Sequence, residues 1–183
     1  QDLLCEGQHI HEKAMEEFRK LVELLRENGV EVHVFSSPKG KSTPDAVFPN
    51  NWISFHEDGR IFLYPMLTPN RRVERRPEII DEVKKHFFVS EIVDLTHEEN
   101  DNRILEGTGS IVFDRNNMMA YANASARTNK NLFYDVVELL GYEGVFFRAS
   151  DKLGKSIYHT NVLLAIGEGY AVICKEVIDS AQA

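Results

Sequence analysis

The chain has 183 residues, of which 43% are hydrophobic and 27% are charged, and its formal net charge is −8. This balance excludes a fibrous or disordered chain, and the acidic excess argues against a nucleic-acid partner. No apolar run approaches the roughly 20 residues that span a bilayer, so no membrane partner is expected either. We expect one domain over residues 1–183, in the cytoplasm.

The first predicted element is an amphipathic helix. Residues 10–28 place apolar side chains at helical spacing, and Gly29 stands where a C-terminal cap belongs. Residues 30–37 alternate apolar and polar side chains, which predicts a strand. The following stretch, rich in Pro, Gly and Ser, predicts a loop.

An α/β pattern then repeats along the chain. Hairpins are predicted over residues 46–66, 108–124 and 161–174. A helix and a strand follow each of the first two hairpins, at 74–88 with 91–96 and at 129–140 with 144–149. The unit is therefore β-β-α-β, and such units must pack against one another to bury their apolar faces.

Polar residues recur where the first strand of each hairpin begins. They form the clusters Asn50–Asn51, 105–109 (LEGTG) and 158–161 (YHTN), and 55 residues separate Asn51 from Glu106 while 53 separate Glu106 from His159. Taken singly, each is more often a turn or structural residue. Their shared phase predicts that they converge on one axis.

A carboxylate and an imidazole that face one pocket suit proton transfer. Glycines at 107 and 109 allow the backbone to approach a ligand closely. The GTG segment lacks the strand–GxGxxG–helix context of a nucleotide site. The Cys and His spacings fit no zinc pattern. No metal or organic cofactor is expected.

Several strings resemble one group of enzymes. PDAVFPNNWISFHEDGRIFLYPM, PNRRVERRPEII, LEGTGSIVFDR, SART and YHTNVLLAIG are similar to the arginine deiminase and amidinotransferase superfamily, and within it to citrulline-utilisation hydrolases and arginine-deiminase-related proteins. The resemblance implies a pentein fold, an α/β propeller of five β-β-α-β blades, of which roughly three are expected here. It also implies a small amino-acid substrate and covalent catalysis by a cysteine thiolate.

The resemblance assigns roles to individual residues. Glu106 matches the acidic partner that holds substrate nitrogens, and His159 matches the catalytic histidine. Asn161 falls where that histidine's segment often carries Asp. Arg127 matches the arginine that holds the substrate carboxylate.

Two further assignments from the resemblance each leave an alternative role open. Arg71 or Arg72 would give a second carboxylate contact, since a guanidinium can grip a carboxylate with two hydrogen bonds, or would be a solvated helix start. Asp45 matches an acidic position of the dimethylarginine-hydrolysing relatives and would line the pocket, or cap a loop.

The dipeptide Asn50–Asn51 departs from the resemblance. Deiminases carry Asp where this chain has Asn51, and a neutral ureido group suits an amide, which offers both a donor and an acceptor. The sequence therefore favours citrulline, hydrolysed to ornithine, over the alternative of arginine deiminase or dimethylarginine hydrolase activity.

Neither cysteine occupies the place of the nucleophile. Cys174 lies in an apolar strand and is expected to be a buried thiol, and Cys5 precedes the first motif. The nucleophile is thus expected outside this sequence, and the open sheet edges of a partial propeller favour association, including a homo-oligomer. The alternatives are a non-catalytic pentein that binds a partner, or a hydrolase that uses Ser156 with His159, which strand alternation disfavours.

Overall fold

The structure, a computed structural model, describes residues 2–37, 40 and 43–179. The chain divides into two compact units, Gln1–Ser36 and Ser37–Ala183. Among the described residues, no helix combines the length and the apolar character that crossing a bilayer requires.

The first unit is one long helix and a short extended tail. Helix α1 (Asp2–Glu27) begins before the predicted range, and Gly29 ends it in the left-handed conformation (φ 80°). The N–H groups of Gly29 and Val30 donate to the carbonyls of Arg26 and Leu25, which is the Schellman arrangement that the sequence predicted.

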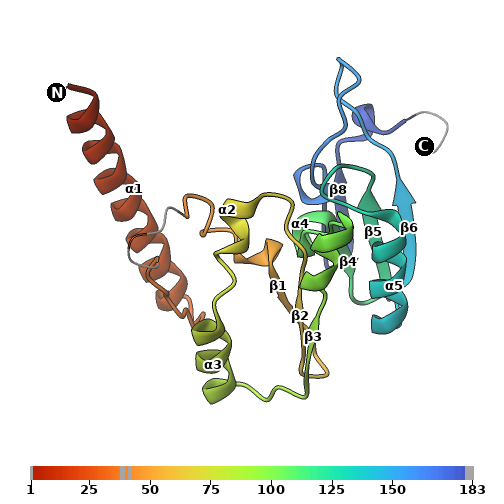
Figure 1. Cartoon of the computed structure of the whole chain (residues 1–183), viewed down its shortest axis with the longest axis horizontal. Coiled ribbons are helices and arrows are strands. Elements are labelled where there is room, and N and C mark those ends of the chain that lie inside the picture. Colours follow the sequence, from red (N-terminus) through yellow and green to blue (C-terminus); the bar gives the residue numbers. More distant parts are fainter. Residues whose placement is uncertain (1, 38–39, 41–42, 180–183) are drawn as a thin grey trace. The chain divides into compact units, whose positions relative to one another are not determined.

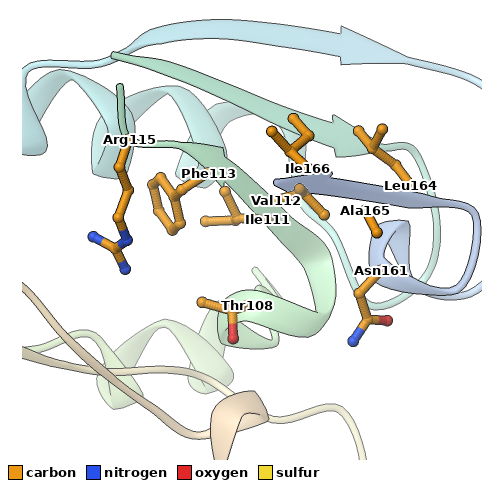
Figure 2. Close-up of a pocket in the computed structure, with 9 residues that line it drawn as sticks. All are labelled: Thr108, Ile111, Val112, Phe113, Arg115, Asn161, Leu164, Ala165 and Ile166. Atoms are coloured by element: carbon orange, nitrogen blue, oxygen red, sulfur yellow. The ribbon is translucent and has the colours of Figure 1, made fainter. Parts of the chain in front are cut away.

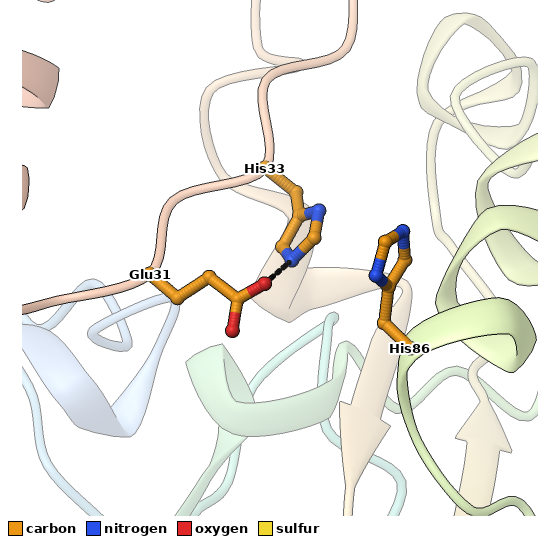
Figure 3. Close-up of side chains that lie close together, drawn as sticks. All are labelled: Glu31, His33 and His86. Carbon is orange, nitrogen blue, oxygen red and sulfur yellow. Dashed lines mark hydrogen bonds and ion pairs between the residues drawn. The ribbon is translucent and has the colours of Figure 1, made fainter.

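The strand predicted over residues 30–37 is wrong. Residues 31–37 have no regular secondary structure, and most are exposed. Local contacts hold this tail instead: the Arg26 guanidinium donates to the Val32 carbonyl at 2.8 Å, and His33 Nε2 lies 2.8 Å from Glu31 Oε1 (Figure 3). Alternation alone forms no strand, because a strand also requires a hydrogen-bonded neighbour.

The second unit contains the predicted β-β-α-β repeat twice, and then a hairpin (Figure 1). Its strands are β1 (Ile53–Phe55), β2 (Arg60–Leu63), β3 (Glu91–Asp94), β4 (Ile111–Asp114), β5 (Met119–Asn123), β6 (Glu143–Phe147), β7 (Leu164–Gly167) and β8 (Tyr170–Ile173). They form three small sheets, in the orders β1-β2-β3, β4-β5-β6 and β7-β8. Each hairpin is antiparallel, and β3 and β6 pair in parallel with β2 and β5.

A helix precedes the parallel strand of each complete sheet. Helix α3 (Pro77–His86) precedes β3, and α5 (Lys130–Leu140) precedes β6, as the sequence predicted. Asn129 caps α5 by accepting a hydrogen bond from Leu132 N–H, and Gly141 ends it at φ 76°. The short helix α2 (Pro69–Arg72) lies between β2 and α3.

Within the described part of the chain, the core consists of three clusters of buried apolar residues. One joins β2, β4, β5 and α5 through residues that include Phe62, Leu105, Ile111 and Phe133. A second is centred on Trp52 and is covered by the apolar side of α3. The third packs Leu164 of β7 against Phe147 of β6. Because the clusters draw on successive repeats, packing brings the starts of the hairpins together.

The prediction of a buried thiol at Cys174 is wrong. Cys174 follows β8 and is exposed, and all four residues of β8 are exposed as well. Among the described residues β8 pairs only with β7, so the apolar pattern of 170–174 has no layer against it.

Candidate active site

A short helical turn precedes the first strand of each hairpin. These turns are η1 (Pro49–Asn51), α4 (Gly107–Ser110) and η3 (Thr160–Val162). The sequence predicted that strands begin here, and the turns are the reason that the polar residues interrupt the apolar pattern. Asn51 ends the first turn, whereas Glu106 and His159 stand at the N-caps of the other two.

Glu106 lies at the centre of the candidate site, with no exposed surface. Arg127 Nη1 donates to both of its carboxylate oxygens, at 2.9 Å each. The Leu67 N–H donates to Oε1 at 3.0 Å, and His159 Nε2 lies 2.8 Å from Oε2. A buried carboxylate with this many donors is held in one orientation.

These contacts set the charge of Glu106. Burial raises the pKa of the carboxyl, but the hydrogen bonds from His159, Leu67 N–H and Arg127, with the charge of Arg127, outweigh it and leave the pKa below its ordinary value. Glu106 is therefore an anion at neutral pH. An anion accepts hydrogen bonds only, so His159 Nε2 carries the proton that it shares with Glu106.

This assignment gives the other ring nitrogen of His159 its role. In the neutral imidazole, a protonated Nε2 leaves Nδ1 as an acceptor. Nδ1 is turned toward Gly109: a Cβ built on that glycine would lie 3.0 Å from Nδ1 and from Cε1. His159 is 6% exposed, so its ring is largely shielded from bulk water.

Asn51 lies against the same glycine. A Cβ on Gly109 would lie 2.2 Å from Asn51 Nδ2, which no real side chain tolerates. Glycine is thus required at 109 so that the amide of Asn51 and the ring of His159 can flank one point. The predicted convergence of Asn51, Glu106 and His159 is seen in the structure.

The position of Arg71 differs from the expected carboxylate contact. Arg71 is 6% exposed and donates to Asn51 Oδ1 at 2.6 Å, to Glu74, and to the backbone carbonyls of Asp45 and Phe48. Its guanidinium is thus occupied by the protein. The geometry supports a role in holding Asn51 and the loop before it.

The remaining predicted residues border the cluster. Asn50 contributes its backbone carbonyl, which accepts a 3.4 Å hydrogen bond from Thr108 Oγ1. Asp45 is half-buried and contributes its carbonyl to Arg71. Arg72 is half-buried, and its Nε lies 3.2 Å from Glu99 Oε2. Asn161 is exposed on η3.

Figure 2 shows that Asn161 lines a hollow over β4 and β7. Most of its lining is apolar, and the polar residues in it are Thr108, Arg115 and Asn161. Thr108 stands between the two glycines of α4, whereas Asn51, Glu106 and His159 do not line the hollow.

Sequence reasoning missed two supports of the site. Glu74 is 3% exposed and bonds Arg71, although nothing in the arginine-rich stretch 70–76 predicts its burial. Thr160 Oγ1 donates to the Ser110 carbonyl at 2.6 Å and accepts from Asn123 N–H at 2.8 Å, which ties the third turn to the second. The polar Asn123 at the end of an apolar strand was an available signal for a further contact, because its side-chain Nδ2 donates to the Ile157 carbonyl at 2.6 Å.

Comparison with known families decides the relationship. The sequence profile of the family described as N,N dimethylarginine dimethylhydrolase, eukaryotic, matches residues 1–183. The chain belongs to this family. The resemblance to guanidino-group-modifying enzymes is thereby confirmed. No curated protein matches the chain.

Solved structures share the fold of this family member. One is the substrate-bound N-terminal domain of ArgZ, an arginine dihydrolase from the ornithine-ammonia cycle in Cyanobacteria, with a TM-score of 0.73 and 22% identity over 93% of this chain and 58% of that chain. AgrE with L-arginine has the same TM-score and identity, over 93% of this chain and 24% of AgrE. A dimethylarginine dimethylaminohydrolase adduct has a TM-score of 0.65 and 21% identity, over 88% of this chain and 60% of that chain.

These likenesses concern the fold, which is mixed α/β with small sheets. This chain spans 58% of the length of the ArgZ domain that it matches.

Proposed function

We propose that this chain carries the acid–base pair of a C–N hydrolase that acts on the guanidino group of arginine or of a methylated arginine. The observation that carries the proposal is the buried contact between Glu106 and His159, with Arg127 on the other side of the carboxylate. A buried anion that shares a proton with an imidazole suits a cationic substrate that must gain and lose protons.

The reaction begins when the thiol of the nucleophile gives its proton to His159 Nδ1, and the resulting thiolate adds to the central guanidino carbon and forms a tetrahedral adduct. This adduct expels ammonia or an alkylamine, which takes its proton from His159. Water then loses a proton to His159 Nδ1 and attacks the same carbon, the C–S bond breaks, and a ureido product leaves. His159 thus gives one proton and takes one back.

Glu106 has two tasks in this scheme. It supplies a negative charge near the cationic guanidinium, while its own oxygens accept from Arg127, Leu67 N–H and His159, and it holds His159 in the tautomer with a bare Nδ1. Arg127 is 26% exposed in its side chain, and within the described part of the chain only its Nη1 has a hydrogen-bond acceptor assigned. We propose that its remaining donors hold the substrate carboxylate.

The nucleophile is proposed to come from a cysteine outside residues 1–183. Cys174 is exposed, and its Sγ lies 3.7 Å from Glu176 rather than in the buried cluster. In support, the ArgZ domain that shares the fold was crystallised with its substrate as a cysteine-to-serine variant.

Two observations favour a guanidino substrate over the citrulline that the sequence suggested. The description of the matching family names dimethylarginine, and the solved structures that share the fold include an arginine dihydrolase. The site agrees, because the Glu106 carboxylate offers a cationic guanidinium an opposite charge.

A ureido substrate is the second candidate, and Asn51 favours it. Arg71 occupies Oδ1, so Asn51 presents the donor Nδ2 toward Gly109. A guanidinium carries donors only, whereas a ureido group carries an acceptor oxygen. Asn51 therefore suits a ureido group, whether supplied as citrulline or formed in the site from a guanidino substrate.

We also propose that the three sheets are blades of an α/β propeller around this site. The support is the repeat itself: each hairpin begins with a helical turn, and the three turns meet at Gly107, Gly109, Asn51 and His159.

The test is turnover by the full-length protein. Arginine, asymmetric dimethylarginine and citrulline are supplied separately, and ammonia, dimethylamine and ornithine are quantified by mass spectrometry. We expect turnover of a guanidino compound, lowered about 10²-fold or more by His159→Asn. A folded protein that consumes none of the three compounds would refute the proposal.

A further inference from the structure

We infer that Glu74 is a positioning residue of the site, which acts through Arg71 to fix the side-chain amide of Asn51. This inference rests on the proposed function for its effect on turnover. The contact chain runs from the Glu74 carboxylate to the Arg71 guanidinium and on to Asn51 Oδ1.

The first link is a buried ion pair. The Glu74 side chain is 1% exposed, and that of Arg71 is 7% exposed. Arg71 Nη2 donates to Glu74 Oε2 at 2.9 Å, and Nε lies 3.2 and 3.3 Å from the two carboxylate oxygens. A two-point contact of this kind fixes the plane of the guanidinium. A solvated surface charge would show neither the burial nor the two contacts.

The second link fixes the loop before the site. Arg71 Nη2 also donates to the backbone carbonyls of Asp45 and Phe48, at 3.1 and 3.2 Å. These carbonyls lie just before the turn that ends at Asn51. The guanidinium therefore holds both the side chain of Asn51 and the chain that leads to it.

The third link sets the orientation of the amide. Arg71 has donors only, so the Asn51 atom that faces Nη1 at 2.6 Å must be the carbonyl Oδ1. Nδ2 then points the other way, against Gly109 and beside His159. Without a fixed Arg71, the two ends of the amide could exchange places, and the site would present an acceptor where it now presents a donor.

The test uses Glu74→Gln in the full-length protein, because this change keeps the shape of the side chain and removes its charge. The first measurement is the NMR signal of the Asn51 side-chain NH2, assigned by its disappearance in Asn51→Ala. We expect the two Asn51 NH2 protons to shift or broaden in Glu74→Gln. The matched control is Glu98→Gln, which disrupts the Glu98–Arg103 ion pair (3.1 Å) and leaves the Asn51 signal unchanged.

The second measurement is a double-mutant cycle on kcat/KM. If Glu74 acts through Asn51, Glu74→Gln lowers kcat/KM about tenfold alone and by less than about twofold in the Asn51→Ala background. If Glu74 is only structural, the two losses multiply, which would overturn the inference.

The two measurements separate this inference from the proposed function. If the protein turns over no guanidino or ureido compound, the proposed function is refuted. The NMR signal still tests the positioning of Asn51 in that case. An Asn51 signal unaffected by Glu74→Gln, in a protein that remains folded by thermal unfolding, would overturn the inference. Arg71→Met serves as the second variant and is expected to change the same signal.

Discussion

The Glu106 carboxylate and the His159 imidazole are 53 residues apart in the chain and 2.8 Å apart in the fold. Each stands at the N-cap of the helical turn that opens its own hairpin. The repeat is what brings them together, because packing successive β-β-α-β units aligns the starts of their hairpins. The proposed acid–base pair is thereby built from equivalent positions of two repeats.

Removal of the Glu106 charge tests how much the fold depends on this pair. Glu106→Gln weakens the charged hydrogen bonds to Arg127, whose side chain is 26% exposed, so we expect the free energy of unfolding to fall by about 1–3 kcal/mol. Urea denaturation at neutral pH measures the loss. The exposed Glu91 provides the control, and Glu91→Gln should change stability by less than about 0.5 kcal/mol.

The lowered pKa of Glu106 predicts a pH dependence with a definite sign. The folded carboxyl ionises below its ordinary value of about 4.3, so the unfolded chain binds more protons near that pH. The stabilisation is present above about pH 4.3 and is lost as the pH falls through the folded pKa. The stability difference between the native protein and Glu106→Gln should therefore shrink in acid. A difference that grows in acid would contradict this assignment.

His56 should titrate far below an ordinary histidine. Burial and the charge of Arg115 lower its pKa to about 4, and its Nε2 lies 2.8 Å from Ser54 Oγ. An NMR titration of the ring protons should give this value. The lowered pKa also fixes the sign of the effect on stability. The contribution of His56 to the free energy of unfolding is full above about pH 6.5 and is lost as the pH falls toward 4. His56→Gln should flatten that part of the stability profile.

Gly109→Ala should disable the site. The new methyl would lie 2.2 Å from Asn51 Nδ2, and neither Asn51 nor His159 has room to move, because both are buried. We expect a loss of about 1–3 kcal/mol, typical of overpacking, and a loss of turnover of at least tenfold. Gly154→Ala is the control: it places a methyl in open space at φ 76°, so it costs about 1–2 kcal/mol through the backbone alone and should spare turnover.

The sequence predicted the repeat because each of its parts has a local signal. The helix over Lys130–Leu140 shows regular apolar spacing and a glycine cap, and the hairpins show alternation with a polar turn. The short turns at Asn51, Glu106 and His159 have no such signal, since three or four residues are too few to establish a helical period.

The ion pairs of the site were harder to predict. Glu74 and Arg71 lie three residues apart in a charged stretch, and only tertiary packing buries them. The same limit explains the error at Cys174, where the apolar pattern predicts burial although no described layer covers β8. Burial depends on what packs against a segment, and a single strand's pattern does not contain that information.

Measuring the tautomer of His159 tests the proposed proton transfer most directly. With 15N-labelled histidine at alkaline pH, where the imidazole is neutral, the 15N shifts distinguish a protonated ring nitrogen from a bare one. We predict a protonated Nε2, bonded to Glu106, and a bare Nδ1 that faces Gly109. A protonated Nδ1 and a bare Nε2 would contradict it, because His159 could not then share its proton with Glu106 and serve as the base.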